Sequence, residues 1–237
     1  MLERLHIIGT SHIAAESVEK IGAFLESHEI DLVCVELDKE RLVALQNNVQ
    51  QRIRPTNLSM LRQVGLTGFI FALIASVTQR KLGEQVKTKA GSDMMAAVRH
   101  AAKRQIPVAL IDQKVAVTLK NLSKNVTFKE KMRLVWDLLK GLVGLDSALT
   151  EISLNDIDLK KVPSDAVIEK VLKKTKHRYA GLYDVLVASR NRYMAKRILT
   201  LLSNHPDWNI LVVIGAGHKE GLVEMLEHKA GEQVKYK

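Results

Sequence analysis

Cysteine, proline and aromatic residues are scarce in this sequence. The single cysteine, Cys34, excludes a disulfide framework and a cysteine-rich zinc module. Only 4 prolines and 13 glycines occur among 237 residues, which excludes collagen-like and proline-rich architectures. Aromatic residues make up 4%, too few for stacking platforms that bind single-stranded nucleic acid, so we expect no nucleic-acid partner. Because Cys34 lies in an apolar run, we expect its thiol to be buried and inert.

Long apolar runs are also absent. The longest uncharged stretch covers residues 63–79, and its apolar part, from Leu66 to Val77, is shorter than the roughly 20 residues that span a bilayer. We expect this part to be a helix that packs over the sheet edge or against a second subunit, with peripheral membrane contact as an alternative. No signal peptide is expected, because a strand-like run follows Met1 almost directly. These features favour a cytoplasmic protein, with membrane association left open.

The charged residues are in excess on the positive side. Lys and Arg number 36 against 26 Asp and Glu, which gives a formal net charge of +10. Apolar residues make up 46% and charged residues 26%, the balance of a globular protein with a buried core. The positive excess permits contact with an anionic surface. Residues 170–178 are especially basic, although a solvated helix face explains that segment more simply.

Four short apolar runs predict the strands of a parallel sheet. They cover residues 5–8, 31–36, 107–111 and 209–214, and segments of helical periodicity separate them. This alternation is typical of a parallel sheet with right-handed crossovers. We therefore predict a single α/β domain over residues 1–237, with a central, mainly parallel sheet flanked by helices. Helical insertions are expected at about 56–90 and 114–178, and no C-terminal membrane domain is expected.

Each predicted strand ends in residues that can bind a ligand. Gly9 to His12 follows the first strand, Glu36 to Asp38 the second, Asp112 the third and Gly215 to His218 the fourth. Because ligands of open parallel sheets bind at the carboxyl ends of the strands, we expect these residues to share one cleft. Imidazoles and carboxylates together are typical ligands of Mn, Fe, Co or Zn, so a divalent metal is the expected cofactor.

Two Gly-x-x-His motifs, from Gly9 to His12 and from Gly215 to His218, carry this interpretation. Chance supplies about 0.4 such matches in a chain with 13 Gly and 8 His, so the motif by itself is a weak signal. Both copies directly follow a predicted strand, where a glycine allows a sharp turn and a close approach of a ligand to the backbone. The alternative is that each histidine caps a loop or a helix and binds nothing.

Two acidic residues, Glu36 and Asp93, are further candidates. Glu36 ends an apolar run, and a buried carboxylate is costly unless it is paired, hydrogen-bonded or bound to a metal. Arg41, in the first turn of the following helix, is its alternative structural partner. Asp93 lies where a helix is predicted to begin, so a carboxylate favoured by the helix dipole is the alternative to a catalytic role.

Arg190 is the basic candidate. It lies between Leu186 and Met194 on the stripe of a predicted helix that should face the core. An inward guanidinium suits the bidentate capture of a carboxylate, a phosphate or a developing oxyanion. A salt bridge that only holds the helix in place is the alternative.

The order and spacing of these residues resemble the TraB/PrgY family. The motifs that carry the resemblance lie at residues 7–12, 35–38 with Arg41, 91–94, 111–112, 118–119, 190–195 and 215–221. The resemblance covers about residues 5–227, and the TraB/PrgY family is usually grouped with the Tiki, erythromycin-esterase-like and ChaN-like proteins. It implies an α/β fold in which the Gly-x-x-His pair and the acidic residues form one cleft.

The resemblance also implies a chemistry. Tiki members are regarded as metal-dependent proteases that cleave a secreted signal protein, and PrgY/TraB members are associated with the shutdown of peptide pheromone signalling. It follows that His12, Glu36 and His218 are the first-choice metal or catalytic residues. The residues that would support them are Gly9, Arg41, Asp112, Arg190 and Gly215.

Three positions depart from residues that are frequent in the family. Asp93 stands in place of Glu, Gln113 in place of an Arg, and Ser189 in place of a Glu. Asp93 has a side chain one methylene shorter than Glu, and Gln113 and Ser189 lack a charge. Because catalysis could need those groups, the sequence leaves two functions open, one catalytic and one not.

The first function is a metal-dependent hydrolase that acts on a peptide or small protein. In this hypothesis His12, Glu36 and His218 hold a divalent ion that lowers the pKa of bound water. Either Glu36 or Asp93 could instead serve as the general base, and Arg190 would stabilise the oxyanion. The second function is a non-catalytic protein that sequesters a peptide signal in the same cleft. A homodimer is compatible with either.

Overall fold

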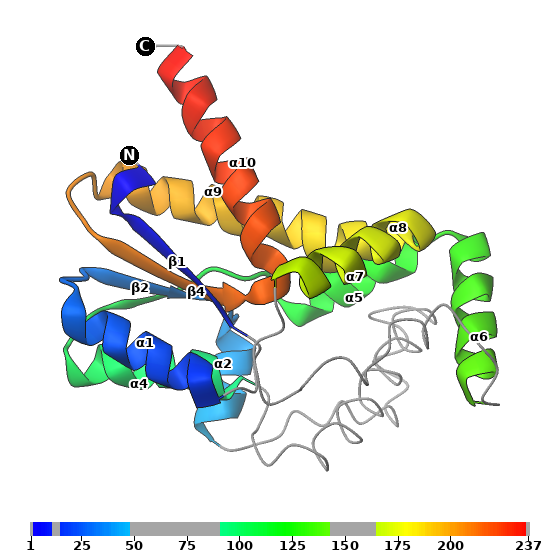
Figure 1. The fold of residues 1–237 in the computed structure, drawn as a ribbon, viewed down its shortest axis with the longest axis horizontal. Helices are drawn as coiled ribbons and strands as arrows, with labels where there is room; N and C mark the ends of the chain where they lie inside the picture. The colour runs from blue at the N-terminus through cyan, green and yellow to red at the C-terminus, as the bar shows by residue number, and fades with distance from the viewer. Residues whose placement is uncertain (1, 11–14, 48–90, 143–164, 236–237) are drawn as a thin grey trace.

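The computed structural model describes residues 2–10, 15–47, 91–142 and 165–235. Within them, four parallel strands form one sheet in the order β1-β4-β2-β3 (Figure 1). The strands are β1 (Leu5–Thr10), β2 (Leu32–Val35), β3 (Val108–Leu110) and β4 (Ile210–Gly215). The α/β fold with a parallel sheet is thereby confirmed.

Helices surround this sheet and continue beyond one end of it. A short 3-10 helix, Leu2–Arg4, precedes β1, and a π-helical turn covers Asp184–Ala188. The α-helices are α1 (Ala15–Ser27), α2 (Lys39–Gln46), α4 (Ser92–Lys103), α5 (Val115–Asn125), α6 (Phe128–Leu142), α7 (Asp165–Arg178), α8 (Ala180–Tyr183), α9 (Ser189–Asn204) and α10 (Ala216–Lys235).

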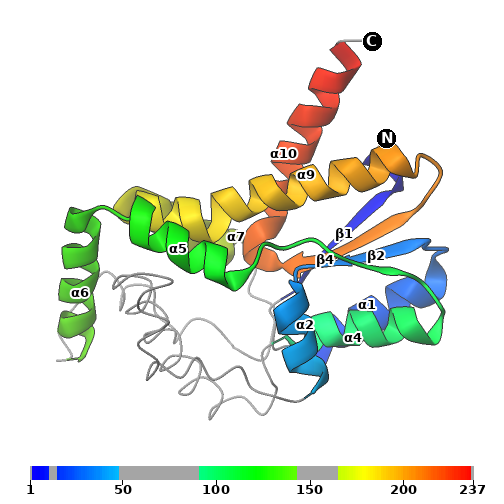
Figure 2. The ribbon, with the colours of Figure 1, turned by 180° about the vertical axis from the view of Figure 1, so that it is seen from behind.

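Both faces of the sheet are covered, which explains the continuous apolar strands. Every residue of β2 and β4 is buried, as expected for a parallel sheet between two helical layers. Val33 and Val213 belong to one core cluster with residues of α1 and α4. Cys34 and Val212 point to the other face and belong to a cluster with residues of α9 and α10. Figures 1 and 2 show the two layers from opposite sides.

Cys34 lies in the middle of β2 and is fully buried. Burial raises the pKa of its thiol to about 12, although the charge of Arg197 acts in the opposite direction. A thiol with so high a pKa is not a nucleophile at neutral pH, so the expectation of a buried, inert cysteine agrees with the structure.

The strand order brings residues from distant parts of the chain to one edge. The last strand, β4, lies between β1 and β2, so Thr10 pairs with Gly215 and Val35 pairs with Val213. Val35 also pairs with Leu110 of β3. All strands run in the same direction, and the residues that follow them are therefore gathered at the same edge of the sheet.

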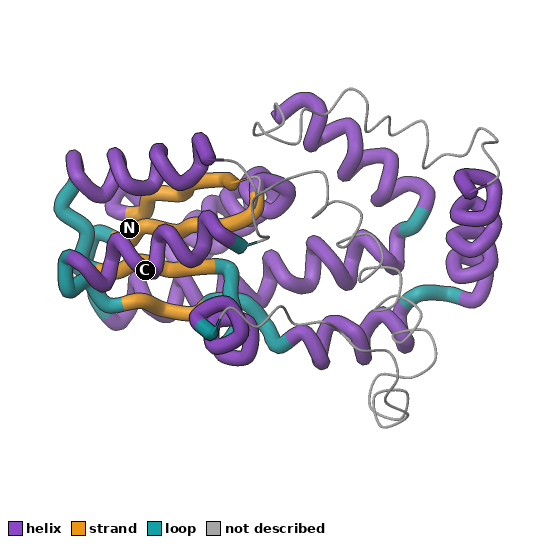
Figure 3. The backbone as a smooth tube through the Cα atoms, turned by 90° about the horizontal axis from the view of Figure 1, so that it is seen from below, coloured by secondary structure: helices purple, strands orange, loops and turns teal. Residues whose placement is uncertain are grey.

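The helices from α5 to α8 extend away from the sheet, and α6 lies at the far end of the molecule (Figures 1 and 3). The insertion expected at 114–178 is helical where the structure describes it. The expected insertion at 56–90, with the apolar segment from Leu66 to Val77, lies outside the described residues. No helix in the described part of the chain is long and apolar enough to cross a membrane.

Two helical elements have features that the apolar pattern of the sequence does not reveal. The helix α10 begins at Ala216, directly after β4. His218 therefore lies in the first helical turn instead of a loop. The helical run after Ala180 contains the π-helical turn, in which the Ser189 N–H reaches back to the Asp184 carbonyl. One wide turn shifts the helical phase by a single residue, which a periodicity of apolar residues does not reveal.

Candidate functional site

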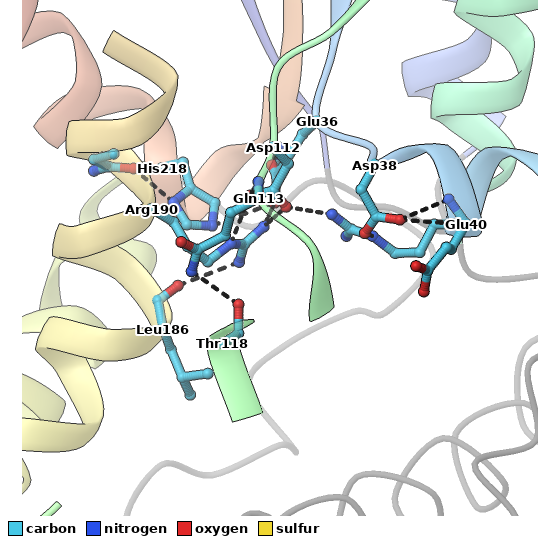
Figure 4. Close-up of polar contacts among 12 residues, drawn as sticks. Glu36, Asp38, Glu40, Asp112, Gln113, Thr118, Leu186, Arg190 and His218 are labelled. Carbon is cyan, nitrogen blue, oxygen red and sulfur yellow. Dashed lines mark hydrogen bonds and ion pairs between the residues drawn. The ribbon is translucent and has the colours of Figure 1, made fainter. Parts of the chain in front are cut away.

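Polar and charged side chains from three strand ends and one helix meet at the carboxyl edge of the sheet. Glu36 follows β2 directly, Asp112 follows β3 after one residue, and His218 follows β4 in the first turn of α10. Arg190 reaches them from α9. In Figure 4 the side chains of these four residues converge from their different elements. His12, the third residue expected here, lies outside the described residues.

The orientation of His218 is fixed by two polar contacts. Its Nδ1 atom lies 2.7 Å from Oδ1 of Asn191, and its Nε2 atom lies 3.3 Å from Oε1 of Glu36. An amide oxygen only accepts hydrogen bonds, so Nδ1 carries a proton and donates a hydrogen bond to Oδ1 of Asn191. The Nε2 atom is thereby directed at the Glu36 carboxylate. This is the arrangement in which a histidine either forms an ion pair or binds a metal through Nε2.

Glu36 is buried, and both of its carboxylate oxygens accept hydrogen bonds. Oε2 accepts from the backbone N–H of Gly215 at 2.6 Å, and Oε1 is paired with the guanidinium of Arg190. These contacts offset the cost of removing a carboxylate from water. The Gly215 N–H comes from the end of β4, so the glycine of the second Gly-x-x-His motif contributes its backbone to the site.

Arg190 joins the carboxylates that follow β2 and β3. Its Nε and Nη2 atoms donate to the two oxygens of Asp112 at 3.1 and 2.6 Å, and Nη2 also donates to Glu36. Nη1 donates to the backbone carbonyl of Leu186 at 3.2 Å. Four of the five guanidinium N–H groups are used in these contacts. Burial alone would lower the pKa of Arg190, but the charges of Glu36 and Asp112 hold it above the ordinary value.

Asp112 and Arg41 extend the cluster to α2. Burial would raise the pKa of Asp112, but its hydrogen bond to Arg190 and the charges of Arg190 and Arg41 hold it below the ordinary value. Arg41 pairs with Asp112 and donates from Nε to Asp38 at 2.8 Å. Asp38 also caps α2 through the backbone N–H of Arg41 at 3.0 Å. Arg41 was considered as the partner of Glu36, but it contacts Asp38 and Asp112, and Arg190 is the guanidinium that pairs with Glu36.

Asp93 lies on the β1 side of the same edge. It is fully buried in the first turn of α4, which begins after Gly91 at a φ of 85°. One oxygen accepts from the Met94 N–H at 2.8 Å, and the other accepts from the hydroxyl of Thr10, the last residue of β1. Asp93 therefore joins the start of α4 to the end of β1, in agreement with the alternative of a carboxylate at a helix N-terminus.

Asn191 is a site residue that the sequence analysis missed. It is 1% exposed on the buried stripe of α9 that also carries Met194 and Ile198. A Cβ atom added to Gly221 of α10 would meet its Nδ2 atom at 2.8 Å, so this glycine leaves room for the amide. A polar amide on an otherwise apolar stripe was the available signal, because such a group needs a partner inside the protein.

The other expected positions have structural contacts. Gln113 donates from its side chain to the Thr118 hydroxyl in α5 at 2.9 Å. Ser189 donates to the Val185 carbonyl in the π-helical turn at 3.1 Å. A Cβ atom on Gly9 would lie 3.2 Å from Lys219 Cδ, so a glycine at this position lets the first turn of α10 approach β1 closely.

The side chains of this cluster fit a divalent metal in part. Two ligands that each lie about 2.1 Å from one ion are roughly 3 to 3.5 Å apart, and the Nε2 of His218 is 3.3 Å from Oε1 of Glu36. The described contacts also join three carboxylates to two guanidiniums and one imidazole. Among the described residues, no group of three or more His, Cys, Asp or Glu side chains is arranged to hold a metal ion.

The fold and the cluster define a class of protein. It is an α/β protein in which a parallel sheet presents a buried ionic cluster, including the histidine of a Gly-x-x-His motif, at the carboxyl ends of its strands. The chain matches the TraB/PrgY/gumN family over residues 2–234. It belongs to that family.

Several curated proteins are similar to this chain. An uncharacterized protein of Methanocaldococcus jannaschii is 33% identical over 223 residues, which are 94% of this chain and 53% of that protein. The TraB domain-containing proteins of Homo sapiens and Mus musculus are 23% and 22% identical over 201 residues, which are 81% of this chain and 50% of each relative. The chain thus spans about half the length of the curated relatives it matches.

Proposed function

We propose that this protein is a metal-dependent hydrolase that acts on peptides, with its reaction centre at the carboxyl ends of β2 and β4. The observation that carries the proposal is the orientation of His218. Asn191 accepts from Nδ1 at 2.7 Å, which directs Nε2 at Oε1 of Glu36. A histidine held through one nitrogen, with the other directed at a carboxylate, is typical of a metal ligand with its supporting hydrogen bond.

Glu36 and His218 would hold the ion, and His12 is the third ligand that the first Gly-x-x-His motif suggests. The mixture of imidazole and carboxylate favours Mn, Fe, Co or Zn. Such an ion, when bound, supplies a Lewis acid and lowers the pKa of a coordinated water.

The chain's own residues would orient this centre. The Gly215 N–H and Arg190 fix the two oxygens of Glu36, and Asp112 fixes Arg190 in turn. Because four of its N–H groups are used in these contacts, Arg190 serves mainly as a positioning residue, in place of direct oxyanion stabilisation. The general base would be Asp93, or Glu36 if it acts as a base instead of a ligand; both are buried carboxylates.

The peptide class of substrate comes from the resemblance to Tiki and PrgY proteins. The second candidate is a protein that binds a peptide signal without cleaving it. The specific observation in its favour is that both oxygens of Glu36 accept hydrogen bonds from the protein, which makes that carboxylate less available as a base. The same residues would serve both functions, so an assay of peptide cleavage distinguishes the two.

The test measures metal content and peptide cleavage on the same preparations of the full chain. Bound metal is quantified by elemental mass spectrometry after dialysis, and cleavage of a mixed peptide library is followed by mass spectrometry. We expect the wild type to hold one divalent ion per chain and to cleave peptides. His218→Ala should lose both properties, whereas the matched variant His177→Ala, at an exposed position of α7, should keep both.

Three outcomes would count against the hydrolase. Peptide binding without cleavage by the metal-loaded wild type would favour the sequestering protein. Equal metal content in wild type and His218→Ala would remove His218 from the metal site. Absence of both binding and cleavage over the whole library would overturn the peptide proposal.

A further inference from the structure

The helix α6 exposes a row of large apolar side chains. Phe128, Met132 and Trp136 are 76%, 53% and 60% exposed. They are spaced by four residues, so they lie on one face of the helix. Both views of the ribbon place α6 at the end of the molecule that is far from the sheet (Figures 1 and 2). This outward apolar face is separate from the ionic cluster.

The polar side of α6 attaches it to the rest of the protein. Arg178 of α7 donates to both oxygens of Asp137 from Nη2 at 2.8 and 2.6 Å, and the Tyr179 hydroxyl also donates to Asp137. Glu130 accepts from the Gly181 N–H at 2.7 Å. Burial would raise the pKa of Asp137, but these hydrogen bonds from Tyr179 and Arg178 hold it below the ordinary value.

This attachment reverses the usual arrangement of an amphipathic helix. A surface helix normally turns its apolar stripe to the core and its charged side to the solvent. In α6 the buried Asp137 faces the protein, and the row from Phe128 to Trp136 faces outward. Because Asp137 is bonded to Arg178 and Tyr179, the outward direction of the apolar row is built into the fold.

Cations flank this row. Lys129, Arg133 and Lys140 lie one to four residues from its members, on the adjoining side of the helix. The Nζ atom of Lys140 lies 5.8 Å from the centre of the Trp136 ring. Arg133 donates to the Arg178 carbonyl, a neutral group that leaves its positive charge in place. The two acidic residues of α6, in contrast, are bonded to groups of the protein itself.

We propose that α6 binds peripherally to an anionic lipid surface, with Phe128, Met132 and Trp136 inserted at the headgroup level. Aromatic and apolar residues on one face with Lys and Arg beside them are the features of helices that lie in a membrane interface. A two-fold dimer through the same face is disfavoured, because it would bring the three cations of one copy close to those of the other. The formal net charge of +10 adds long-range attraction to a negative membrane.

The test uses the full chain and two kinds of vesicle. The first contains phosphatidylcholine with about one third phosphatidylserine, which supplies an anionic surface, and the second contains phosphatidylcholine alone. Binding is measured by flotation. Insertion is measured by the fluorescence of Trp136 in a Trp208→Phe background, where Trp136 is the remaining tryptophan. We expect binding and a blue shift with the anionic vesicles, and weak or no binding with the neutral ones.

Two pairs of variants divide the apolar from the electrostatic contribution. Phe128→Ser with Met132→Ser should weaken binding by roughly tenfold for each side chain removed from the interface. Lys129→Gln with Lys140→Gln should weaken it by roughly 25-fold in total. The matched controls are Val43→Ser with Val117→Ser, at exposed apolar positions of α2 and α5, and Lys120→Gln with Lys124→Gln on α5. They should bind like the wild type, and thermal melting should show that all variants fold.

Other results would overturn the proposal. One is no flotation of the folded full chain with anionic vesicles, and another is flotation that the α6 variants leave unchanged. A third is a dimer, detected by light scattering without vesicles, that the change of Phe128 and Met132 dissociates. That result would assign the α6 face to a second copy of the chain.

Discussion

At the scale of single residues, Arg190 is the side chain on which the ionic cluster depends most. It connects Glu36, after β2, with Asp112, after β3, through a planar fork that a lysine cannot reproduce. We predict that Arg190→Lys lowers the free energy of unfolding by about 2 kcal/mol, because one of the two buried carboxylates loses its contact with the side chain at position 190. Urea denaturation monitored by circular dichroism measures the change.

The matched control is Arg192→Lys, two residues along the same helix. Arg192 pairs with Asp184 at 2.9 Å, but both side chains are largely exposed. The control should change the free energy of unfolding by less than about 0.5 kcal/mol. If Arg190→Lys is as stable as this control, the guanidinium of Arg190 does not hold the ends of β2 and β3 together. Arg190 would then be available for a ligand.

A second prediction at this scale concerns the ring of His218. Because Oδ1 of Asn191 accepts from Nδ1, nitrogen NMR should find the proton on Nδ1 in the wild type, whether or not Nε2 is also protonated. Asn191→Leu removes the acceptor, and the neutral ring should then shift toward the other tautomer. An unchanged tautomer in the leucine variant would show that Asn191 does not orient the ring.

The residues of the cluster differ in how far the sequence could predict them. Glu36 and His218 were predictable, because each follows an apolar strand and the ends of parallel strands meet. The contact between Glu36 and Arg190 was not predictable, since Arg41 lies closer to Glu36 in sequence. Which of the two arginines pairs with Glu36 depends on the order of the strands in the sheet. Asn191 escaped prediction because its importance comes from the proximity of α10, which no local pattern encodes.

At the scale of elements, the packing of α9 against α10 depends on Gly221. Alanine normally stabilises a helix interior relative to glycine by about 1 kcal/mol. At Gly221, however, the new Cβ would lie 2.8 Å from Nδ2 of Asn191, closer than side chains tolerate. We predict that Gly221→Ala is less stable than Gly231→Ala by about 2 kcal/mol, since overpacking outweighs helix propensity.

Gly231 is the control because it lies on the same helix with nothing within 4 Å of an added Cβ. Gly231→Ala should raise the free energy of unfolding by roughly 0.5 to 1 kcal/mol. Both variants are compared by urea denaturation. Equal stabilisation by the two alanines would mean that α10 moves away from α9 at little cost.

The elements themselves were largely predictable. The four apolar runs correspond to β1 through β4 within one or two residues at most ends, because buried parallel strands leave a continuous apolar signature. Two local features were not predictable. The start of α10 directly at Ala216 depends on β1 and β4 lying side by side, and the π-helical turn before Arg190 inserts one residue without changing the composition.

At the scale of the whole molecule, the sheet order connects the fold with the site. Placing β4 between β1 and β2 brings the N-terminal half of the chain, which supplies Glu36 and Asp112, to the C-terminal segment that supplies Arg190 and His218. The order was not predictable from the sequence, since several arrangements of four apolar parallel strands satisfy the same pattern. The ionic cluster is therefore a contact between chain halves, and its charge state should affect the stability of the entire fold.

The last prediction tests this coupling through the pH dependence of stability. The pKa of Asp112 in the folded protein lies below its ordinary value, mainly because Arg190 and Arg41 overcome the effect of burial. A depressed pKa contributes stability that is complete above the unfolded-state pKa, about 3.9 for an aspartate, and is lost as the pH falls through the folded-state value. The wild type should therefore lose stability steeply below about pH 4. Asp112→Asn should be less stable at neutral pH by about 3 kcal/mol, because two guanidiniums lose a shared carboxylate.

Asp112→Asn should also lose stability less steeply than the wild type below about pH 4. The slopes of the free energy of unfolding against pH should differ by up to about 1.4 kcal/mol per pH unit, because the variant takes up one proton fewer on unfolding. Some slope will remain, since Asp137 and Glu130 also have lowered pKa values in the folded state. Asp207→Asn is the control, because Asp207 is 94% exposed in its pair with Arg4 and lies outside the ionic cluster. Urea denaturation from pH 2.5 to pH 7, as an approximate range around the aspartate pKa, measures all three proteins. Parallel curves for the wild type and Asp112→Asn would show that Asp112 titrates normally and that the cluster does not couple the two halves of the chain.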